Sequence, residues 1–145
     1  MKPYSRLAVA LIIVASVCFA QAPASSAIET EGLSNGRRWS RMEINDRLIY
    51  IIAYHDGLMA GVFYLGSGTQ KEKIARLAEM YPATMTLTEI GVAIDTFYNT
   101  PENALISVPR AMSFIAMKAA GVQQAEIDRL LSLARKVAAD SFAPK

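Results

Sequence analysis

Apolar residues recur along the chain at intervals of three and four, which is the spacing of an α-helix. In the segment 41–65 the apolar or neutral positions at this spacing are Ile44, Leu48, Ile51, His55, Leu58 and Val62. Because an α-helix turns once in about 3.6 residues, these side chains share one face. The pattern predicts that residues 41–65 form the first helix of the domain and that this helix is the central, most buried one.

The same periodicity predicts four more helices, over about 70–81, 87–99, 108–120 and 124–140. Residues that end helices follow three of them, namely Pro82, Pro101 and Gly121. After residue 27 the sequence contains neither strand-type alternation nor an internal repeat. We therefore predict an all-α fold, a single compact bundle of about five helices.

Helix starts are marked by a hydroxyl residue followed three positions later by a glutamate. Such capping boxes occur at Ser40 and Glu43, Thr69 and Glu72, and Thr86 and Glu89, with a weaker form at Gln123 and Glu126. In a capping box the hydroxyl accepts from a free backbone N–H, and the glutamate accepts from the N–H of the cap residue. We also expect Ser107 to cap the fourth helix.

The N-terminal segment has the order of a secretory signal peptide. Lys2 and Arg6 precede an uncharged apolar run, and a tract of small residues follows. The apolar run is shorter than the roughly 20 residues that a membrane-spanning helix needs. We therefore expect cleavage after Ala20 or Ala27, with a slight preference for Ala27, a periplasmic or secreted location, and no stable membrane anchor after cleavage.

These boundaries divide the chain into a signal peptide at 1–27, an irregular lead-in at 28–38 and a helical domain at 39–141. Cleavage removes Lys2 and Arg6 but no acidic residue, so the 15 basic and 13 acidic residues of the whole chain become 13 of each. A chain without net charge offers no electrostatic reason to bind nucleic acid or an anionic membrane. The only cysteine, Cys18, is also removed, which excludes a disulfide and a thiolate metal site in the domain.

His55 is the only histidine, and Asp56 follows it directly. Adjacent helical residues point about 100° apart. The residues one turn away from His55 are all apolar, namely Ile51, Ile52, Leu58 and Met59. A half-buried structural histidine is therefore favoured over a catalytic one. A metal ion would lack a second histidine and a cysteine as ligands, so we expect neither a metal nor a cofactor.

Asp95 lies near an apolar helix face, where a carboxylate must find donors or shift its pKa. Arg110 is the expected partner, because a cation in the first turn of a helix opposes the helix dipole unless an acid holds it. We predict a buried or half-buried network of Asp95, Tyr98, Asn103 and Arg110, and leave open whether Asp56 joins it. The favoured interpretation is that this network locks the third helix to the fourth, and the alternative is a catalytic carboxylate pair.

Glycine, methionine and aromatic residues allow both structural and functional interpretations. Gly57 and Gly61, with Gly91 on the third helix, predict a close helix–helix approach, because glycine inside a helix costs about 1 kcal/mol against alanine. Trp39 is expected to act as a hydrophobic staple over the first helix. Trp39 and the other large side chains are favoured as core, and the alternatives are a ligand groove between the first and third helices or an adaptable partner surface. The other large side chains are Met42, Met59, Met80, Met85, Met112, Met117, Tyr50, Tyr54, Phe63 and Tyr64.

Two stretches of the chain resemble a known group of proteins. They are Trp39 followed by Tyr50-x3-Tyr54-His-Asp-Gly57, and Asp95-x-Phe-Tyr98-x2-Pro101-x-Asn103-x2-Ile106-x-Val108. Together they resemble an uncharacterised family of small exported bacterial helical proteins. In layout the chain is also distantly similar to the Tai-type periplasmic immunity proteins, helical modules that block peptidoglycan-cleaving toxins. Many of those carry cysteines expected to form a disulfide, whereas this chain has no cysteine after residue 27.

Export, the lack of a recognisable catalytic set and this resemblance predict a non-enzymatic helical module that binds an envelope or secreted protein. Inhibition of an envelope enzyme is one form of that role. The alternatives are a small-molecule or lipid carrier with a groove of methionine and aromatic side chains, and an enzyme that uses Asp56 and Asp95. The candidate binding residues are Trp39, Tyr54, His55, Asp56, Asp95, Tyr98, Asn103 and Arg110. No residue is assigned a catalytic role.

Overall fold

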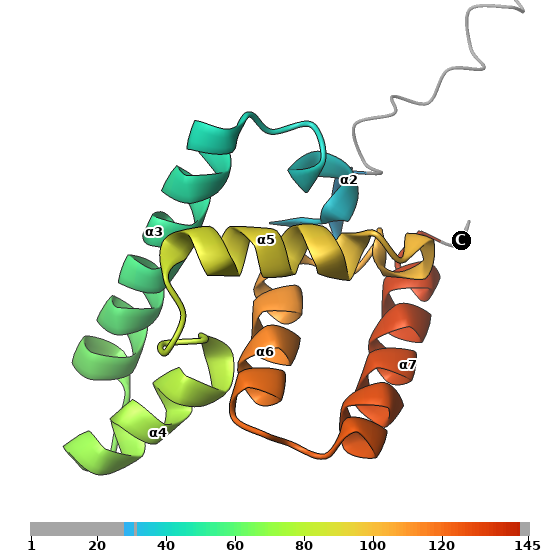
Figure 1. Cartoon of the computed structure of the whole chain (residues 1–145). Coiled ribbons are helices and arrows are strands. Elements are labelled where there is room, and N and C mark those ends of the chain that lie inside the picture. Colours follow the sequence, from blue (N-terminus) through green and yellow to red (C-terminus); the bar gives the residue numbers. More distant parts are fainter. Residues whose placement is uncertain (1–27, 31, 143–145) are drawn as a thin grey trace, which may run out of the picture.

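The computed structural model describes residues 28–30 and 32–142, so the expected signal peptide and both expected cleavage sites lie outside the described residues. The described chain is mostly helical, which confirms the all-α prediction (Figure 1). Its helices are α2 (Gly36–Trp39), α3 (Ile44–Ala60), the π-helix η2 (Gly61–Leu65), α4 (Gln70–Met80), α5 (Leu87–Tyr98), the 3-10 helix η3 (Pro101–Asn103), α6 (Val108–Ala119) and α7 (Gln124–Asp140). The five longest helices lie close to the five predicted ranges.

Two of the predicted capping boxes are present. At the start of α5, the Thr86 hydroxyl accepts from the backbone N–H of Glu89, and the Glu89 carboxylate accepts from the Thr86 N–H at 2.7 Å. The equivalent pair at the start of α4 does the same. The box predicted at Ser40 is wrong, because Glu43 takes the N-cap position of α3 and Ser40 instead follows the end of α2. Ser107 takes the N-cap position of α6 without a side-chain capping hydrogen bond.

The segment before α2 is folded, so the prediction of an irregular lead-in is wrong. Its strands β1 (Glu29–Thr30) and β2 (Leu33–Ser34) pair in antiparallel register, and Asn35 bridges to Ser107 at the start of α6. Asn35 is 0 % exposed, and its amide donates to the Thr30 hydroxyl at 3.1 Å. The Thr30 hydroxyl in turn donates to the backbone carbonyl of residue 105. Contacts with a distant segment fix this structure, and no local pattern in the sequence reveals them.

Trp39 lies at the centre of the core, with 0 % of its surface exposed. This burial confirms the prediction that Trp39 belongs to the core. Its predicted role as a hydrophobic staple is wrong, because Met42, and not Trp39, directly precedes the N-cap residue Glu43 of α3. The residues packed with Trp39 come from several helices, namely Ile51, Tyr81, Ile90, Ile94, Val108 and Met112. A second cluster joins α6 to α7 and comprises Ile106, Phe114, Ile127, Ala134 and Ala138.

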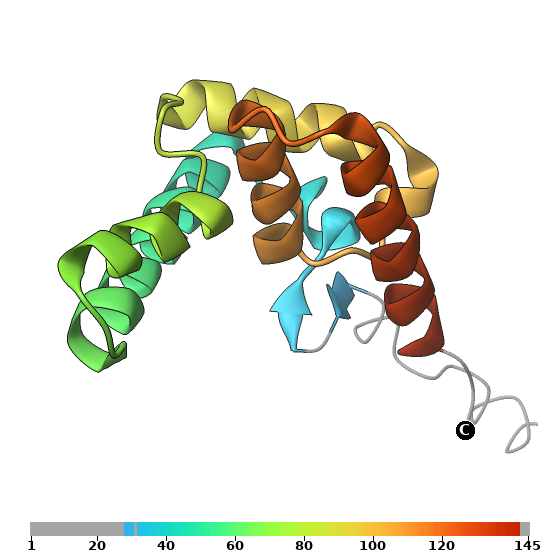
Figure 2. The same cartoon turned by 90° about the horizontal axis from the view of Figure 1, so that it is seen from below.

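Contrary to the prediction, α3 is not the most buried helix. Ile51 is the only buried residue described on α3, whereas α6 carries five buried residues. In both views α3 and α4 lie to one side of α5, α6 and α7 (Figure 1 and Figure 2). We call residues 44–80, which comprise α3, η2 and α4, the arm. Residues 48–53 are apolar around most of the helix, so their periodicity does not identify the face that meets the core.

Candidate functional site

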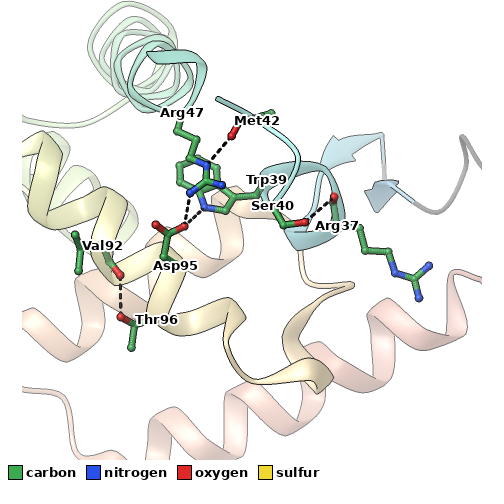
Figure 3. A network of polar contacts seen from close by, with 8 residues as sticks. All are labelled: Arg37, Trp39, Ser40, Met42, Arg47, Val92, Asp95 and Thr96. Atoms are coloured by element: carbon green, nitrogen blue, oxygen red, sulfur yellow. Dashed lines mark hydrogen bonds and ion pairs between the residues drawn. The ribbon is translucent and has the colours of Figure 1, made fainter. Parts of the chain in front are cut away.

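Asp95 on α5 holds together the junction of α2, α3 and α5 (Figure 3). Its Oδ1 accepts from Trp39 Nε1 at 2.7 Å and from Arg47 Nη1 at 2.9 Å. Arg47 also donates from Nε to the Met42 carbonyl at 3.1 Å, and its guanidinium carbon lies 5.4 Å from the centre of the Trp39 ring. The prediction that Arg110 partners Asp95 is wrong, because Arg47 from α3 takes that position.

Tyr98, in the same last turn of α5 as Asp95, and Asn103, just beyond it, fasten the chain that follows the helix. The Tyr98 hydroxyl donates to the Ile106 carbonyl at 2.9 Å, and burial raises the pKa of this hydroxyl. Asn103 is 3 % exposed; its Nδ2 donates at 2.8 Å to a carbonyl near the end of α5, and its Oδ1 accepts from Arg135 Nε at 2.9 Å. The predicted network is therefore divided into separate clusters with separate partners. Each of these clusters is structural, since its polar atoms are used in holding segments of the chain together.

Tyr54 and Arg110 line one hollow at a different place on the molecule. The hollow has a volume of about 220 Å³, lies between β2, α3 and the start of α6, and is also lined by Leu33 and Pro109. Tyr54 is half-buried there, and this burial raises the pKa of its hydroxyl. The hollow joins two of the predicted binding residues, but it is smaller than the roughly 300–1,000 Å³ of a typical ligand site.

His55 and Asp56 lie in the middle of α3. His55 Nδ1 is 3.3 Å from Asp56 Oδ1, and the His55 ring packs against Tyr81 with centroids 4.8 Å apart. The half-buried histidine that the sequence predicted is confirmed, while 73 % of the Asp56 side chain is exposed. Asp56 follows Arg47 by nine residues, which is about 13 Å along a helix. Because Arg47 is the α3 residue that reaches Asp95, the alternative of a catalytic pair of Asp56 and Asp95 lacks the geometry it needs.

The arm exposes apolar side chains along its length. The exposed fraction is 63 % for Ile49, 43 % for Ile52 and 86 % for Tyr64. A helix brings positions three or four apart to the same side, so these residues lie on one side of α3 and η2. We call this surface the arm face, and its residues, all exposed, are Ile49, Ile52, Ala53, Asp56, Ala60 and Tyr64.

The segment Ile44–Leu65, which contains the arm face, is long and apolar enough to cross a membrane. It has 22 residues; an 18-residue window within it has a mean hydropathy of 1.4, and 11 % of that window is buried in the protein. The core helix of a soluble protein meets the same test of length and composition, but such a helix is mostly buried, whereas little of this segment is buried. Several contacts fasten this segment to the folded domain: Ile51 packs in the core, Tyr50, Tyr54 and Leu58 pack against it, and Arg47 is paired with Asp95.

The glycines of α3 do not mediate the predicted close approach of helices. A Cβ added at Gly57, Gly61 or Gly91 would meet nothing within 4 Å in the described part of the chain. The close approach is at Gly36, where an added Cβ would lie 2.4 Å from Cδ1 of the Tyr98 ring. The prediction from the sequence is therefore wrong in its location, and the glycines on α3 leave an open surface beside the arm face.

Sequence reasoning missed Arg47 and Gly36 and did not foresee the arm face. Arg47 follows the apolar Ile44 by three positions, on the side of α3 taken to be buried, and this charged residue was a signal that an acid must lie opposite it. The apolar stripe at 48–53 was a second signal, because it is wider than one buried face of a helix requires. The excess width indicates that some of these apolar side chains are exposed. Gly36 gave no signal, because its packing partner is on a distant helix.

Among residues 28–30 and 32–142, no group of three or more His, Cys, Asp and Glu side chains is arranged to hold a metal ion. The described surface offers the arm face on α3 and η2, the hollow at Tyr54 and Arg110, and an apolar groove between α5, α6 and α7. No protein-family model matches the chain, and neither the curated proteins nor the solved structures contain a significant match.

Proposed function

We propose that this chain is an exported, non-enzymatic helical module that binds another protein through the arm face. The observation that carries the proposal is the exposure of Ile49, Ile52 and Tyr64 on the segment Ile44–Leu65, of which an 18-residue apolar window is 11 % buried. Soluble monomers rarely expose contiguous apolar surface, and where they do, it commonly marks a site of interaction. Burying this surface on a partner would remove it from water.

The composition of the arm face favours a protein partner. Tyr64 is an aromatic residue of the kind enriched at protein interfaces, and Ala53 and Ala60 allow a partner backbone to approach closely. Asp56 adds a single exposed carboxylate near the middle of the face. A cation on the partner that pairs with this carboxylate would fix the orientation of the partner more than it would raise the affinity. An apolar surface with one acid therefore fits a partner that offers an apolar patch around one cation.

The location of the partner follows from the expected export. A signal peptide delivers the domain to the periplasm or the medium, and the resemblance to Tai-type immunity proteins favours an envelope enzyme as the partner. In that form of the role, the arm face covers the active-site entrance of the enzyme. The anchoring of α3 through Arg47 and Ile51 supports this use, since a rigid base reduces the entropy lost on binding.

Site-directed photocrosslinking in the envelope of the host tests the proposal. A photoreactive residue at Ile49 or Tyr64 is expected to crosslink one defined protein. The matched control is Leu133 on α7, which is apolar and 55 % exposed but lies off the arm. Equal crosslinking from Leu133, or none from Ile49 and Tyr64, would show that the arm face is not the binding surface.

A quantitative test uses charge on the arm face. Ile49→Lys is expected to weaken binding to the crosslinked partner by about 2 kcal/mol, the size of an interface hot spot. Leu133→Lys should leave this affinity unchanged. The melting temperatures of both variants should remain close to wild type, because both side chains are exposed. A loss of affinity of the same size in both variants would contradict a specific role for the arm.

A further inference from the structure

An apolar groove lies on the opposite part of the molecule, away from the arm. The groove expected from the sequence was between the first and third helices, but Ile51, Ile90 and Ile94 fill that space with core. The observed groove lies between α5, α6 and α7 and has a volume of about 550 Å³. Figure 2 shows α5 lying across α6 and α7, so the groove has a wall on each of three helices.

The walls of this groove are mainly apolar. Phe97 and Phe114 stack in its lining with centroids 6.1 Å apart, and Ile127 and Leu131 of α7 belong to the same lining and to the same hydrophobic cluster. Its volume lies within the roughly 300–1,000 Å³ of small-molecule sites. Aromatic and branched walls of this kind gain free energy when an apolar ligand displaces water from them.

One end of the groove carries a positive charge. Lys118, in the last turn of α6, is the only charged residue in the lining of the groove in the described chain. It forms no ion pair with any other described residue, so its ammonium group is available to a ligand. Gln124, the first residue of α7, lies in the same lining. The negative end of the α6 dipole, at Lys118, opposes the positive end of the α7 dipole, at Gln124, so the positive charge at this end of the groove is that of Lys118.

The volume of the groove selects between two kinds of apolar occupant. An α-helix with side chains is about 10–12 Å across and rises about 5.4 Å per turn, so it fills roughly 400–600 Å³ per turn. The groove of about 550 Å³ would therefore hold about one turn of a partner helix. A single alkyl chain is much thinner and is buried along its length in the same space.

We propose that the groove between α5, α6 and α7 binds an amphiphile with one alkyl chain and an anionic head group, such as a long-chain carboxylate. The alkyl chain lies against Phe97, Phe114 and Leu131, and the carboxylate pairs with the Lys118 ammonium group. The site is separate from the arm face. It adds a ligand to the proposed function and does not depend on it.

Titration of the exported chain, purified after processing by its own cell and stripped of lipid, tests this site. The probe is dodecanoate, and its cationic counterpart with the same chain is dodecyltrimethylammonium. Wild type is expected to bind dodecanoate in the micromolar range and the cation at least about tenfold more weakly, as the charge of Lys118 requires. Calorimetry gives the affinity, and amide shifts in nuclear magnetic resonance spectra identify the bound surface.

Two pairs of variants separate the head group from the chain. Lys118→Glu should lower the affinity for dodecanoate about tenfold, whereas Lys136→Glu, an exposed lysine on α7 outside the groove, should not. Ala119→Trp places a bulky ring in the groove and should block both probes, whereas Leu133→Trp should block neither. Ala119 and Leu133 are both exposed, so neither substitution should disturb folding, and the melting temperature of each variant checks this.

Each of three outcomes would overturn the proposal. The first is no binding of dodecanoate below about 1 mM, the weak limit of a specific site. The second is equal affinity of wild type and Lys118→Glu for dodecanoate. The third is binding that Ala119→Trp leaves unchanged, or amide shifts confined to the arm, which would place the amphiphile on the arm face instead.

Discussion

Two adjacent isoleucines on α3 have opposite surroundings. Ile51 is 0 % exposed and packs against Trp39, whereas Ile52 is 43 % exposed on the arm face. The junction around Trp39 also satisfies its polar atoms, because Asp95 accepts from both Trp39 and Arg47. On the arm, by contrast, apolar side chains are exposed to water. One helix therefore serves stability on one side and leaves the other side available for binding.

This comparison changes the meaning of the predicted binding residues. Trp39, Asp95, Tyr98 and Asn103 are used at the junction or near it, where each holds one segment of chain to another. Asp56, by contrast, lies among exposed apolar side chains of the arm. A substitution at the junction should therefore change the free energy of unfolding, whereas a substitution on the arm should change binding.

The largest expected difference is between the aromatic residues of the two regions. Trp39→Ala should lower the free energy of unfolding by about 3–5 kcal/mol, the cost of a large cavity in a core. Tyr64→Ala should change it by less than about 0.5 kcal/mol, because 86 % of Tyr64 is exposed. Urea unfolding followed by circular dichroism measures both. Similar losses for the two variants would mean that the arm contributes to the core.

Two glycines provide a comparison in which the expected signs differ. Gly36→Ala should destabilise the protein by about 1–3 kcal/mol, because the new Cβ would lie 2.4 Å from the Tyr98 ring and the ring must move. Gly57→Ala should stabilise it by up to about 1 kcal/mol, since alanine favours the helix and meets nothing within 4 Å in the described chain. The melting temperature should fall for the first variant and rise for the second. A fall for Gly57→Ala would show that this open surface is already covered.

Two aspartates make the same comparison for polar groups. Asp95→Ala removes the acceptor for the buried Trp39 N–H, which should cost about 1–3 kcal/mol. Its salt bridge with Arg47 adds little, because 46 % of the Asp95 side chain is exposed. Asp56→Ala should cost less than about 0.5 kcal/mol, since Asp56 is mostly exposed. An unchanged unfolding midpoint for Asp95→Ala would contradict the structural role of the junction.

The helices were predictable from the sequence because their signals are local. Thr86 and Glu89 lie three residues apart, and the hydrogen bonds between them fix the start of α5 without help from the rest of the chain. The range predicted for α7 matches its bounds, since its apolar residues form one narrow stripe. These features depend on neighbours in sequence, which periodicity and capping rules describe.

The packing of these helices was not predictable in the same way. Gly36 meets Tyr98, and Asn35 meets the start of α6, although more than 60 residues separate each pair. The arm was misplaced for a related reason, because a helix that is apolar on most sides has no single face to place in the core. The same holds for the candidate site. The half-buried position of His55 was predicted correctly from its neighbours along the helix, whereas the partner of Asp95 lies on another helix and was predicted wrongly.

The smallest expected effect compares the capping boxes of the two regions through pH. The backbone N–H of Thr86 donates to the Glu89 carboxylate and holds its pKa below the ordinary value of 4.5, and Thr69 does the same for Glu72 on the arm. A pKa that is lower in the folded state contributes stability that is fully present above pH 4.5 and is lost as pH falls through the lowered value. The melting temperature of Glu89→Gln should therefore lie below that of wild type at pH 7, and the difference should vanish in acid.

The matching variant on the arm is Glu72→Gln. Because α5 carries the core and α4 belongs to the arm, Glu72→Gln should shift the global transition less and instead speed hydrogen exchange within α4. Equal shifts in melting temperature for the two variants would mean that the arm unfolds together with the core.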